Sequence, residues 1–392
     1  MTLGILAVCL LVLLLAWANG ANDIAKGVAT LVGNGTTHAR RAVLWGTLWT
    51  MLGGLAALMW GAALINAFTK GFLSPNFIID LTFVAGVTLG AVAWVGFATR
   101  AGLPVSTTHA LLGGIVGAAL VGTGTTSGTE NLHASAVASK ALLPLLLSPL
   151  IAIGLCVLLL LIMRYVAKKI PAWSPGCCPQ EAWQKNPFVC AAQGRAPAKG
   201  SASAAGGRMP GAAATQPRPP ATVERVWIAL HWLSSGTTSF ARGLNDVPKI
   251  AAFMILALTL APPAVAQTTA SWFPDWLQAW PILLVTLVMG AGCLWGGFKV
   301  LDVLAHRVTP LDASSGLVAN MGTSILVLAA SPLGLPVSTT HVSTGALMGV
   351  RWTDRIKPNQ NDTLKLILFG WVVTLPIAAL VAAASSLFMH QF

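Results

Sequence analysis

The amino-acid sequence predicts an all-α polytopic membrane protein built from two related halves of inverted topology. Of the 392 residues, 55% are hydrophobic and only 9% are charged. Several apolar stretches exceed the roughly 18 residues that a membrane helix needs. Two polar motifs each occur twice and in the same order, as in transporters built from internal repeats. This composition excludes a soluble enzyme.

Long apolar runs predict the spanning helices of both halves. In the first half they lie at residues 3–19, 42–66, 80–99 and 141–163. Two shorter runs that contain glycine, 22–33 and 107–121, are typical of re-entrant half-helices. In the second half the runs lie at residues 226–260, 280–299, 312–330, 338–350 and 363–390. We expect about 10–12 transmembrane segments, some of them discontinuous.

The repeats are predicted at residues 1–166 and 226–392. Five passages in the first repeat make the second begin on the opposite side of the membrane, which is inverted topology. Residues 167–225 are rich in Ala, Gly, Pro and Ser, and they predict a flexible linker because they bury too little apolar surface to fold alone. Nine basic residues between Arg164 and Arg225 place this linker in the cytoplasm. We expect a multi-pass protein of the inner (plasma) membrane with both termini outside.

The net charge of +12 would suggest nucleic-acid binding in a soluble protein, but here it reports orientation in the lipid bilayer. We therefore expect no nucleic-acid partner. The six cysteines give no metal-ligand spacing, so we expect neither a metal site nor a cofactor. Three lie in apolar spans, where they pack as small hydrophobic residues, and three lie in the linker: Cys9, Cys156 and Cys293, then Cys177, Cys178 and Cys190.

The first repeated motif is an Asn-Asp pair followed by a lysine. Its members are Asn22, Asp23 and Lys26 in the first half, and Asn245, Asp246 and Lys249 in the second. A spacing of three puts acid and base on one helical face. A charge at membrane depth costs roughly 3 kcal/mol on insertion scales, so two matched pairs predict a buried polar site. The preceding Gly20 and Gly243 predict helix breaks. The alternative is that the pairs neutralise each other and only hold the helices together.

The second repeated motif is the string Pro-Val-Ser-Thr-Thr-His. Its polar members are Ser106, Thr107, Thr108 and His109, and in the second half Ser338, Thr339, Thr340 and His341. The proline ends one helix and the hydroxyl residues cap the next. Helix N-termini bind anions, and the hydroxyls add donors. The alternative is that these hydroxyls only cap a turn. Each histidine is an accessory candidate as a proton carrier or ligand, although a buried histidine more often stays neutral with one hydrogen bond.

Two further patterns concern packing. Gly113 and Gly117 form a small-residue face that permits close helix approach. Tryptophans near span ends, such as Trp60, Trp272 and Trp276, are typical of anchors at the membrane interface.

The two motifs together resemble those of the inorganic phosphate transporter (PiT) family. Its members carry a Gly-Ala-Asn-Asp signature in each half and the Pro-Val-Ser-Thr-Thr-His string, and the resemblance covers nearly the whole chain except the linker. It implies a secondary carrier for a tetrahedral oxyanion, phosphate or in some relatives sulfate, and it suggests a homodimer. The resemblance also implies that the asparagines, aspartates and hydroxyl residues of both motifs line the pocket for the anion and its coupling ion.

The chain departs from this family at three cationic positions. Lys26 and Lys249 stand where many sodium-coupled relatives have asparagine, and Arg242 stands where a histidine is often found. Our hypothesis is that the lysines replace sodium, so that phosphate enters with a proton. The resemblance then points to a sodium-independent phosphate or sulfate permease branch.

The sequence thus predicts a proton-coupled phosphate symporter that works by alternating access. Monohydrogen phosphate can donate a hydrogen bond to Asp23 or Asp246, whereas the sulfate dianion has no proton to donate. The alternatives are a sulfate permease of the same family and, less favoured, an anion channel. No array of acid, base and nucleophile indicates an enzyme.

Overall fold

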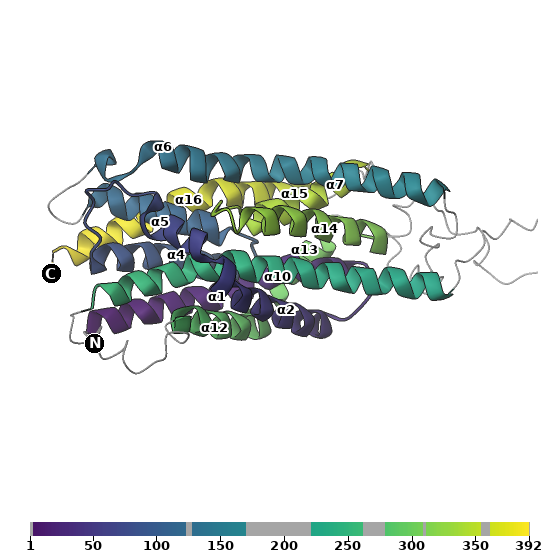
Figure 1. The fold of residues 1–392 in the computed structure, drawn as a ribbon, viewed down its shortest axis with the longest axis horizontal. Helices are drawn as coiled ribbons and strands as arrows, with labels where there is room; N and C mark the ends of the chain where they lie inside the picture. Colours follow the sequence, from purple (N-terminus) through teal and green to yellow (C-terminus); the bar gives the residue numbers. More distant parts are fainter. Residues whose placement is uncertain are drawn as a thin grey trace, which may run out of the picture.

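The structure, a computed structural model, describes residues 3–122, 128–169, 221–261, 279–308, 311–353 and 361–391. Within these ranges the chain is helical and contains no β-strand, in agreement with the predicted fold class. The helices form an elongated bundle (Figure 1). Leu3 and Met389 lie at one end of it, called here the termini end. Lys169 and Ala221 lie at the other, called the linker end (Figure 1).

Each half contributes long helices joined by short ones. The first half contains α1 (Leu3–Gly33), α2 (Ala39–Trp60), α3 (Ala62–Asn66), the π-helix η1 (Ala67–Gly71), α4 (Leu81–Ala101), α5 (Thr107–Val121), the 3₁₀-helix η2 (Thr129–Asn131), α6 (Ala134–Ala136), the π-helix η3 (Val137–Leu142) and α7 (Leu143–Lys169). The second half contains α10 (Ala221–Thr259), α12 (Trp280–Gly296), α13 (Phe298–His306), α14 (Ala313–Ala330), α15 (Thr339–Thr353) and α16 (Asn361–Met389).

Six spans among the described residues are long and apolar enough to cross a membrane, and the pair α12 and α13, bent by 68°, makes a seventh. The 39-residue α10 is about 58 Å long, which exceeds the hydrocarbon thickness, but it carries charges in its middle. The 15-residue α5 and α15 match the short helices predicted after the proline-led motifs. The prediction of 10–12 crossings depends on how these three helices are counted, and it stays a prediction.

The helix breaks predicted at Gly20 and Gly243 are wrong. Both α1 and α10 run without interruption through their glycine, so residues 22–33 are not a separate half-helix. A Cβ at Gly20 would collide with the carbonyl of Met289, and one at Gly243 with that of Thr50. These glycines therefore serve close helix packing and not chain reversal.

The two halves interlock, with each helix packed against partners from the other half. α1 packs against α12 and α2 against α10, while α5 packs against α16 and α7 against α15. These contacts come in matched pairs. In the order of the two halves, α1 and α2 correspond to α10 and α12, and α5 and α7 correspond to α15 and α16. The contact of α1 with α12 therefore matches that of α10 with α2, and the contact of α5 with α16 matches that of α15 with α7. The two halves therefore share a large part of their packing surface.

Matching caps begin α4 and α14 near opposite ends of the bundle. Asp80 caps α4 and Asp312 caps α14, each by accepting from an amide three residues later. Asp80 lies 3.8 Å from His390 at the termini end. Gly316, in the first turns of α14, lies against His231, which is near the linker-end start of α10. This opposite placement is what an inverted repeat requires.

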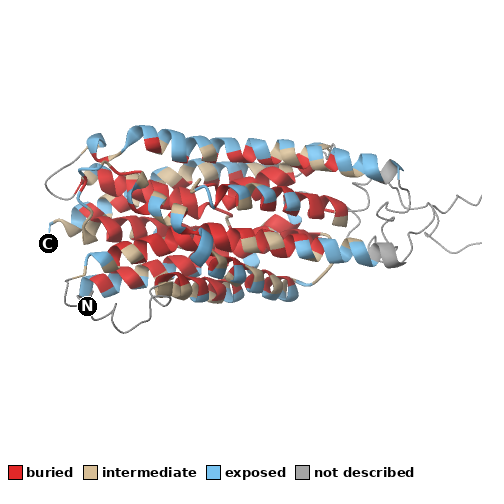
Figure 2. Cartoon of the chain, viewed as in Figure 1, coloured by how far each residue is buried: buried red, intermediate tan, exposed pale blue. Residues whose placement is uncertain are grey.

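Buried residues fill the middle of the bundle, and exposed ones follow its outer faces (Figure 2). Along α1, residues 5–18 contribute to one buried apolar cluster and residues 24–29 to another. The motif residues Asn22 and Asp23 lie between these clusters. The outward faces of α7 and α16 carry exposed leucines such as Leu146 and Leu380, as expected for contact with lipid.

Some predicted features lie outside the described residues. These are residues 170–220 of the linker with Cys177, Cys178 and Cys190, and the interface candidates Trp272 and Trp276.

The contact of α5 with α16 gives a stability prediction. A Cβ at Gly117 would meet the carbonyl of Ala379, whereas a Cβ at Gly154 on α7 would meet nothing within 4 Å. We expect Gly117→Ala to lower the free energy of unfolding by about 1–3 kcal/mol through overpacking. The control Gly154→Ala should leave it equal or higher. Thermal denaturation in detergent measures both, and equal melting temperatures would contradict the packing role.

Candidate functional site

The first Asn-Asp motif lies in the middle of α1 and is held by polar contacts on every side. Asp23 forms an ion pair with Lys26, and both side chains are at most 2% exposed. The amide of Asn22 donates to the Thr99 hydroxyl (3.2 Å) and to the Leu103 carbonyl (2.9 Å), while its oxygen accepts from the Val105 amide (3.2 Å). Asn22 thus holds the loop before α5 against α1.

The second motif repeats this arrangement on α10. Asp246 pairs with Lys249 at 3.6 Å, and Asn245 donates to Asp246 (2.9 Å) and to the Val337 carbonyl (3.3 Å). Ser331 donates to the Asn245 oxygen (3.3 Å). The loop before α15 is therefore held against α10 as its counterpart is held against α1.

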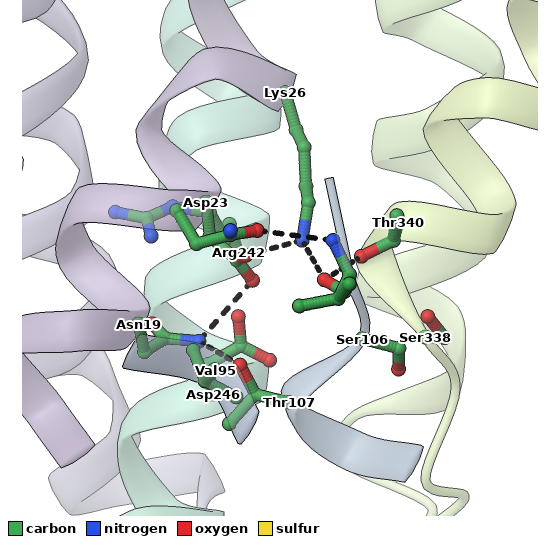
Figure 3. A network of polar contacts seen from close by, with 12 residues as sticks. Asn19, Asp23, Lys26, Val95, Ser106, Thr107, Arg242, Asp246, Ser338 and Thr340 are labelled. Carbon is green, nitrogen blue, oxygen red and sulfur yellow. Dashed lines mark hydrogen bonds and ion pairs between the residues drawn. The ribbon is translucent and has the colours of Figure 1, made fainter. Parts of the chain in front are cut away.

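The two half-sites are joined by hydrogen bonds that cross between the repeats. Thr340 donates to the Val105 carbonyl (2.7 Å), and Thr108 donates to the Val337 carbonyl (3.4 Å). Lys26 also donates to Val105 (3.3 Å), and Lys249 donates to Val337 (3.0 Å) and to the Thr108 hydroxyl (2.9 Å). Figure 3 shows the part of this network around Asp23 and Lys26. These contacts bring both motifs of both halves together in the buried interior, and their role as a ligand site stays a prediction.

Two of the predicted hydroxyls act as helix caps. Ser106 accepts from the His109 amide and Ser338 from the His341 amide, both at 3.2 Å. Both serines therefore cap their helices, and whether they also bind a ligand stays a prediction. The caps start α5 and α15 in the middle of the bundle, where the first-turn amides give each helix a positive end.

Asn19 and Arg242 occupy equivalent positions in the two halves and behave differently. Asn19 donates to Asp23 (3.1 Å) and to the Thr107 hydroxyl (2.9 Å). Arg242 donates to the Thr50 hydroxyl (2.8 Å) and to the Cys293 sulfur (3.1 Å). The guanidinium also interacts electrostatically with both aspartates. Sequence reasoning marked Arg242 as accessory and missed Asn19.

Several buried polar atoms of this cluster have no hydrogen-bond partner among the described residues. They are Asn19 Oδ1, Asp246 Oδ2, and Arg242 Nε and Nη1. Leaving such an atom unsatisfied costs about 1–3 kcal/mol, so their concentration in one place indicates a site that takes up a polar ligand. With every group ionised, three cations and two carboxylates leave a net charge of +1. The cluster therefore favours an anion.

The two accessory histidines contact each other within the first turns of α5 and α15. The rings of His109 and His341 lie 4.3 Å apart between centroids, and His341 lies 3.9 Å from Trp371 of α16. His109 Nδ1 lies 2.8 Å from Ser106 Oγ. The histidines thus connect the repeats, but no described contact links them to the aspartates.

All of the predicted site residues are at most 8% exposed. Thr339 is buried without a described side-chain bond to the cluster. Sequence reasoning missed Asn19, Thr99 and Ser331. Thr99 and Ser331 are the same distance before the two proline-led motifs, and this matched spacing was the available signal.

Comparison with known proteins agrees with this geometry. Residues 19–382 match the phosphate transporter family. The chain belongs to this family. Members with similar sequences include "Probable low-affinity inorganic phosphate transporter" of Rhizobium meliloti, 26% identical over 97% of this chain and 94% of that protein. Another is "Inorganic phosphate transporter 2-1, chloroplastic" of Arabidopsis thaliana, 27% identical over 94% of this chain and 69% of that protein.

A solved structure, "The sodium-dependent phosphate transporter", has the same fold. It superposes with a TM-score of 0.75, is 22% identical and covers 100% of both chains. The match of residues 19–382 to the phosphate transporter family confirms the resemblance inferred from the two motifs. The chain is a transporter-family protein and not an enzyme.

The buried pair on α10 gives a prediction that separates structure from function. Lys249→Met leaves Asp246 as an unpaired buried charge and should lower the free energy of unfolding by about 3–5 kcal/mol. The double variant Asp246→Asn/Lys249→Met removes both charges and should regain most of that stability. Phosphate uptake should be lost in the single variant and in the double variant alike. Thermal denaturation and vesicle uptake measure the two properties.

The matched control is Lys365→Met, which removes a pair with the same spacing whose side chains are 76% and 99% exposed. Exposed pairs contribute about 0–1 kcal/mol, so both readouts should stay near wild type. Normal uptake by the double variant would show that the buried pair is only structural.

Proposed function

We propose that this protein is a secondary carrier of inorganic phosphate that works by alternating access. The observation that supports this most is the enclosed cationic cluster shared by the two halves, with unsatisfied polar atoms of Asn19, Arg242 and Asp246. Two half-sites clamp the anion near the bilayer centre and the halves rock around it. The regions 1–166 and 226–392 are the two inverted repeats of this carrier.

The net charge of the cluster fits a monovalent phosphate. Dihydrogen phosphate brings one negative charge and leaves the loaded cluster neutral, which is the least costly state inside a membrane. Monohydrogen phosphate leaves one excess negative charge, which protonation of an aspartate would remove. Dihydrogen phosphate alone and monohydrogen phosphate with one proton on an aspartate carry the same number of protons and the same net charge. By either route, phosphate uptake is coupled to proton uptake.

Fixed ammonium groups take the place of a travelling sodium ion. Lys26 and Lys249 each lie against an aspartate and a loop carbonyl, which are oxygen ligands of the kind that a sodium ion would use. A cation already in this position offsets the carboxylate charge without a coupling ion. The neighbour named as sodium-dependent shares 22% identity and informs the fold alone.

The orientation follows from the basic residues around the linker. The nine basic residues between Arg164 and Arg225 favour a cytoplasmic linker end. The termini end then faces outward from the plasma or inner membrane. Dimer formation stays a prediction from the family resemblance.

Sodium dependence provides the first test. Purified protein in vesicles should take up labelled phosphate with choline replacing sodium, and an inward proton gradient should accelerate uptake. A carrier also predicts that phosphate inside the vesicles speeds entry by exchange. Strict dependence on sodium would contradict the role of the lysines, and ohmic currents without exchange would indicate a channel.

Substrate choice is tested by competition. Asp246 Oδ2 is buried and free to accept a hydrogen bond from a protonated oxyanion. Excess arsenate, which carries protons like those of phosphate, should therefore inhibit labelled phosphate uptake about as well as unlabelled phosphate does. Equal concentrations of sulfate should inhibit at least about tenfold less, the effect of leaving a buried acceptor unpaired. Equal or stronger inhibition by sulfate would favour a sulfate permease.

A further inference from the structure

A small cavity extends from the cationic cluster toward the linker end. It has room for about one water molecule. Its polar wall combines Lys26 and Thr30 of α1, Asn320 and Thr323 of α14, and Ser343 of α15. Asn320 donates to the Thr30 hydroxyl at 2.9 Å. Hydroxyl and amide groups from three helices thus line one part of the cavity, and Ala29, Leu304, Ala319 and Leu347 line the rest.

Polar side chains continue from this cavity toward the linker end. Thr238 donates to the Asn320 carbonyl (3.0 Å), and Asn320 reaches the Ser234 hydroxyl (3.4 Å). Further along, Asn34 at the end of α1 contacts His231 at 3.1 Å. A seam of buried polar groups therefore connects Lys26 with the linker-end part of α10.

The equivalent positions on the opposite side of the site are mostly apolar. Aligning the two Asn-Asp motifs matches each residue of α1 with one of α10. Aligning the two proline-led motifs matches residues of α4 and α5 with residues of α14 and α15. In this way Thr30, Asn320, Thr323 and Ser343 correspond to Phe253, Thr88, Ala91 and Leu111. All four counterparts are buried. Thr88 alone is polar, so this side offers one hydroxyl where the linker side offers three hydroxyls and one amide.

The parts of α1 and α10 that precede the Asn-Asp motifs show the same asymmetry. His231, Ser235, Thr238 and Ser239 on the linker side correspond to Val8, Val12, Leu15 and Ala16 on the termini side. Every one of these residues is buried. The asymmetry therefore lies in which side chains the two halves carry at matched positions of the sequence.

From this asymmetry we propose a second oxyanion station on the linker side, formed by Thr30, Asn320, Thr323 and Ser343 with Lys26 at its inner end. The cavity holds about one water molecule in this conformation, so the anion occupies the station only when the linker side of the carrier opens and the cavity widens. On the termini side, Phe253, Leu111 and their neighbours form an apolar seal. The inference rests on the proposed phosphate transport and adds a route and a second site to it.

The hydroxyls of this station can donate hydrogen bonds to an anion without leaving a helix carbonyl unpaired. Thr323 donates to the Ala319 carbonyl and Ser343 to the Thr340 carbonyl, one turn back in their own helices. Such a carbonyl usually also accepts a helix amide, so the hydroxyl hydrogen is free to turn toward an arriving oxyanion. The apolar counterparts offer no donor, and an anion placed among them would lose its hydration uncompensated.

Cysteine accessibility at a matched pair of positions tests the station. Ser343→Cys and Leu111→Cys are placed separately in a chain whose native cysteines are replaced, after phosphate uptake by that background is verified. A membrane-impermeant cationic thiol reagent is applied to vesicles of each orientation, and a C-terminal tag reports which end faces outward. We expect position 343 to react at least about tenfold faster than position 111, and from the linker end, because apolar surroundings suppress the reactive thiolate. Inorganic phosphate should slow the reaction at position 343.

Every other result overturns the proposal. Equal rates at the two positions, reaction of position 343 from the termini end, no reaction at either position, or no protection by phosphate would each exclude an aqueous oxyanion station on the linker side. Loss of the proposed function looks different, because wild-type protein would then fail to take up phosphate whatever the reagent rates are.

A second measurement uses the native cysteines and applies if the cysteine-free background is inactive. Thr323→Val/Ser343→Ala removes two hydroxyls and should lower the maximum rate of phosphate exchange about tenfold at an unchanged melting temperature. The control Thr88→Val removes the buried hydroxyl on the apolar side and should leave exchange near wild type. Equal effects of the two variants would show that the linker-side hydroxyls have no special role.

Discussion

The site depends on two loop carbonyls, those of Val105 and Val337, which each bind an ammonium and a hydroxyl at the centre of the bundle. The lysine comes from the same half as the carbonyl, Lys26 for Val105 and Lys249 for Val337, whereas the threonine comes from the other half. A backbone carbonyl just before a new helix lacks the partner it would have inside one, so it must be satisfied by other donors. Satisfying it holds the lysines inside the membrane and fastens the repeats together. The ligand site and the interface between the halves therefore share the same bonds.

This arrangement explains why charges are tolerated at this depth. Each aspartate has a lysine on its own helix, and each lysine has a carbonyl as an additional acceptor, so the cost of removing the charges from water is largely offset. The offset is incomplete at Arg242, whose Nε and Nη1 have no described partner, and at Asp246 Oδ2. A structure optimised only for stability would pair or remove these groups. The concentration of these unpaired atoms beside the two ion pairs supports a binding site over a purely structural charge cluster.

Much of the site could be predicted from sequence, because repeated polar residues in apolar spans have few physical explanations. Asp23, Lys26 and their counterparts had to be buried together, and they are. The path of the chain could not be predicted in the same way. Gly20 permits a break as well as a close contact, and only the carbonyl of Met289 facing it decides between the two. Asn19 was missed because a single asparagine in an apolar helix carries no repeat signal when its counterpart is Arg242. The roles of Ser106 and Ser338 as caps depend on local backbone geometry. The sequence was compatible both with capping and with ligand binding by these serines.

The difference between the two sides of the site also constrains how the carrier moves. On the linker side, hydroxyls and amides can exchange protein partners for water one at a time, so access there can change through side-chain rotations. On the termini side, Phe253 and Leu111 are buried among other apolar residues, and rotating one side chain cannot create a hydrated path through them. Opening that side requires whole helices to separate, and the helices in question, α5 and α10, carry Thr108 and Lys249 of the central site. Because Lys249 donates to Thr108, an anion that draws this ammonium away loosens the contact between these two helices. In the proposed carrier, this hydrogen bond would couple occupancy of the site to opening of the apolar side.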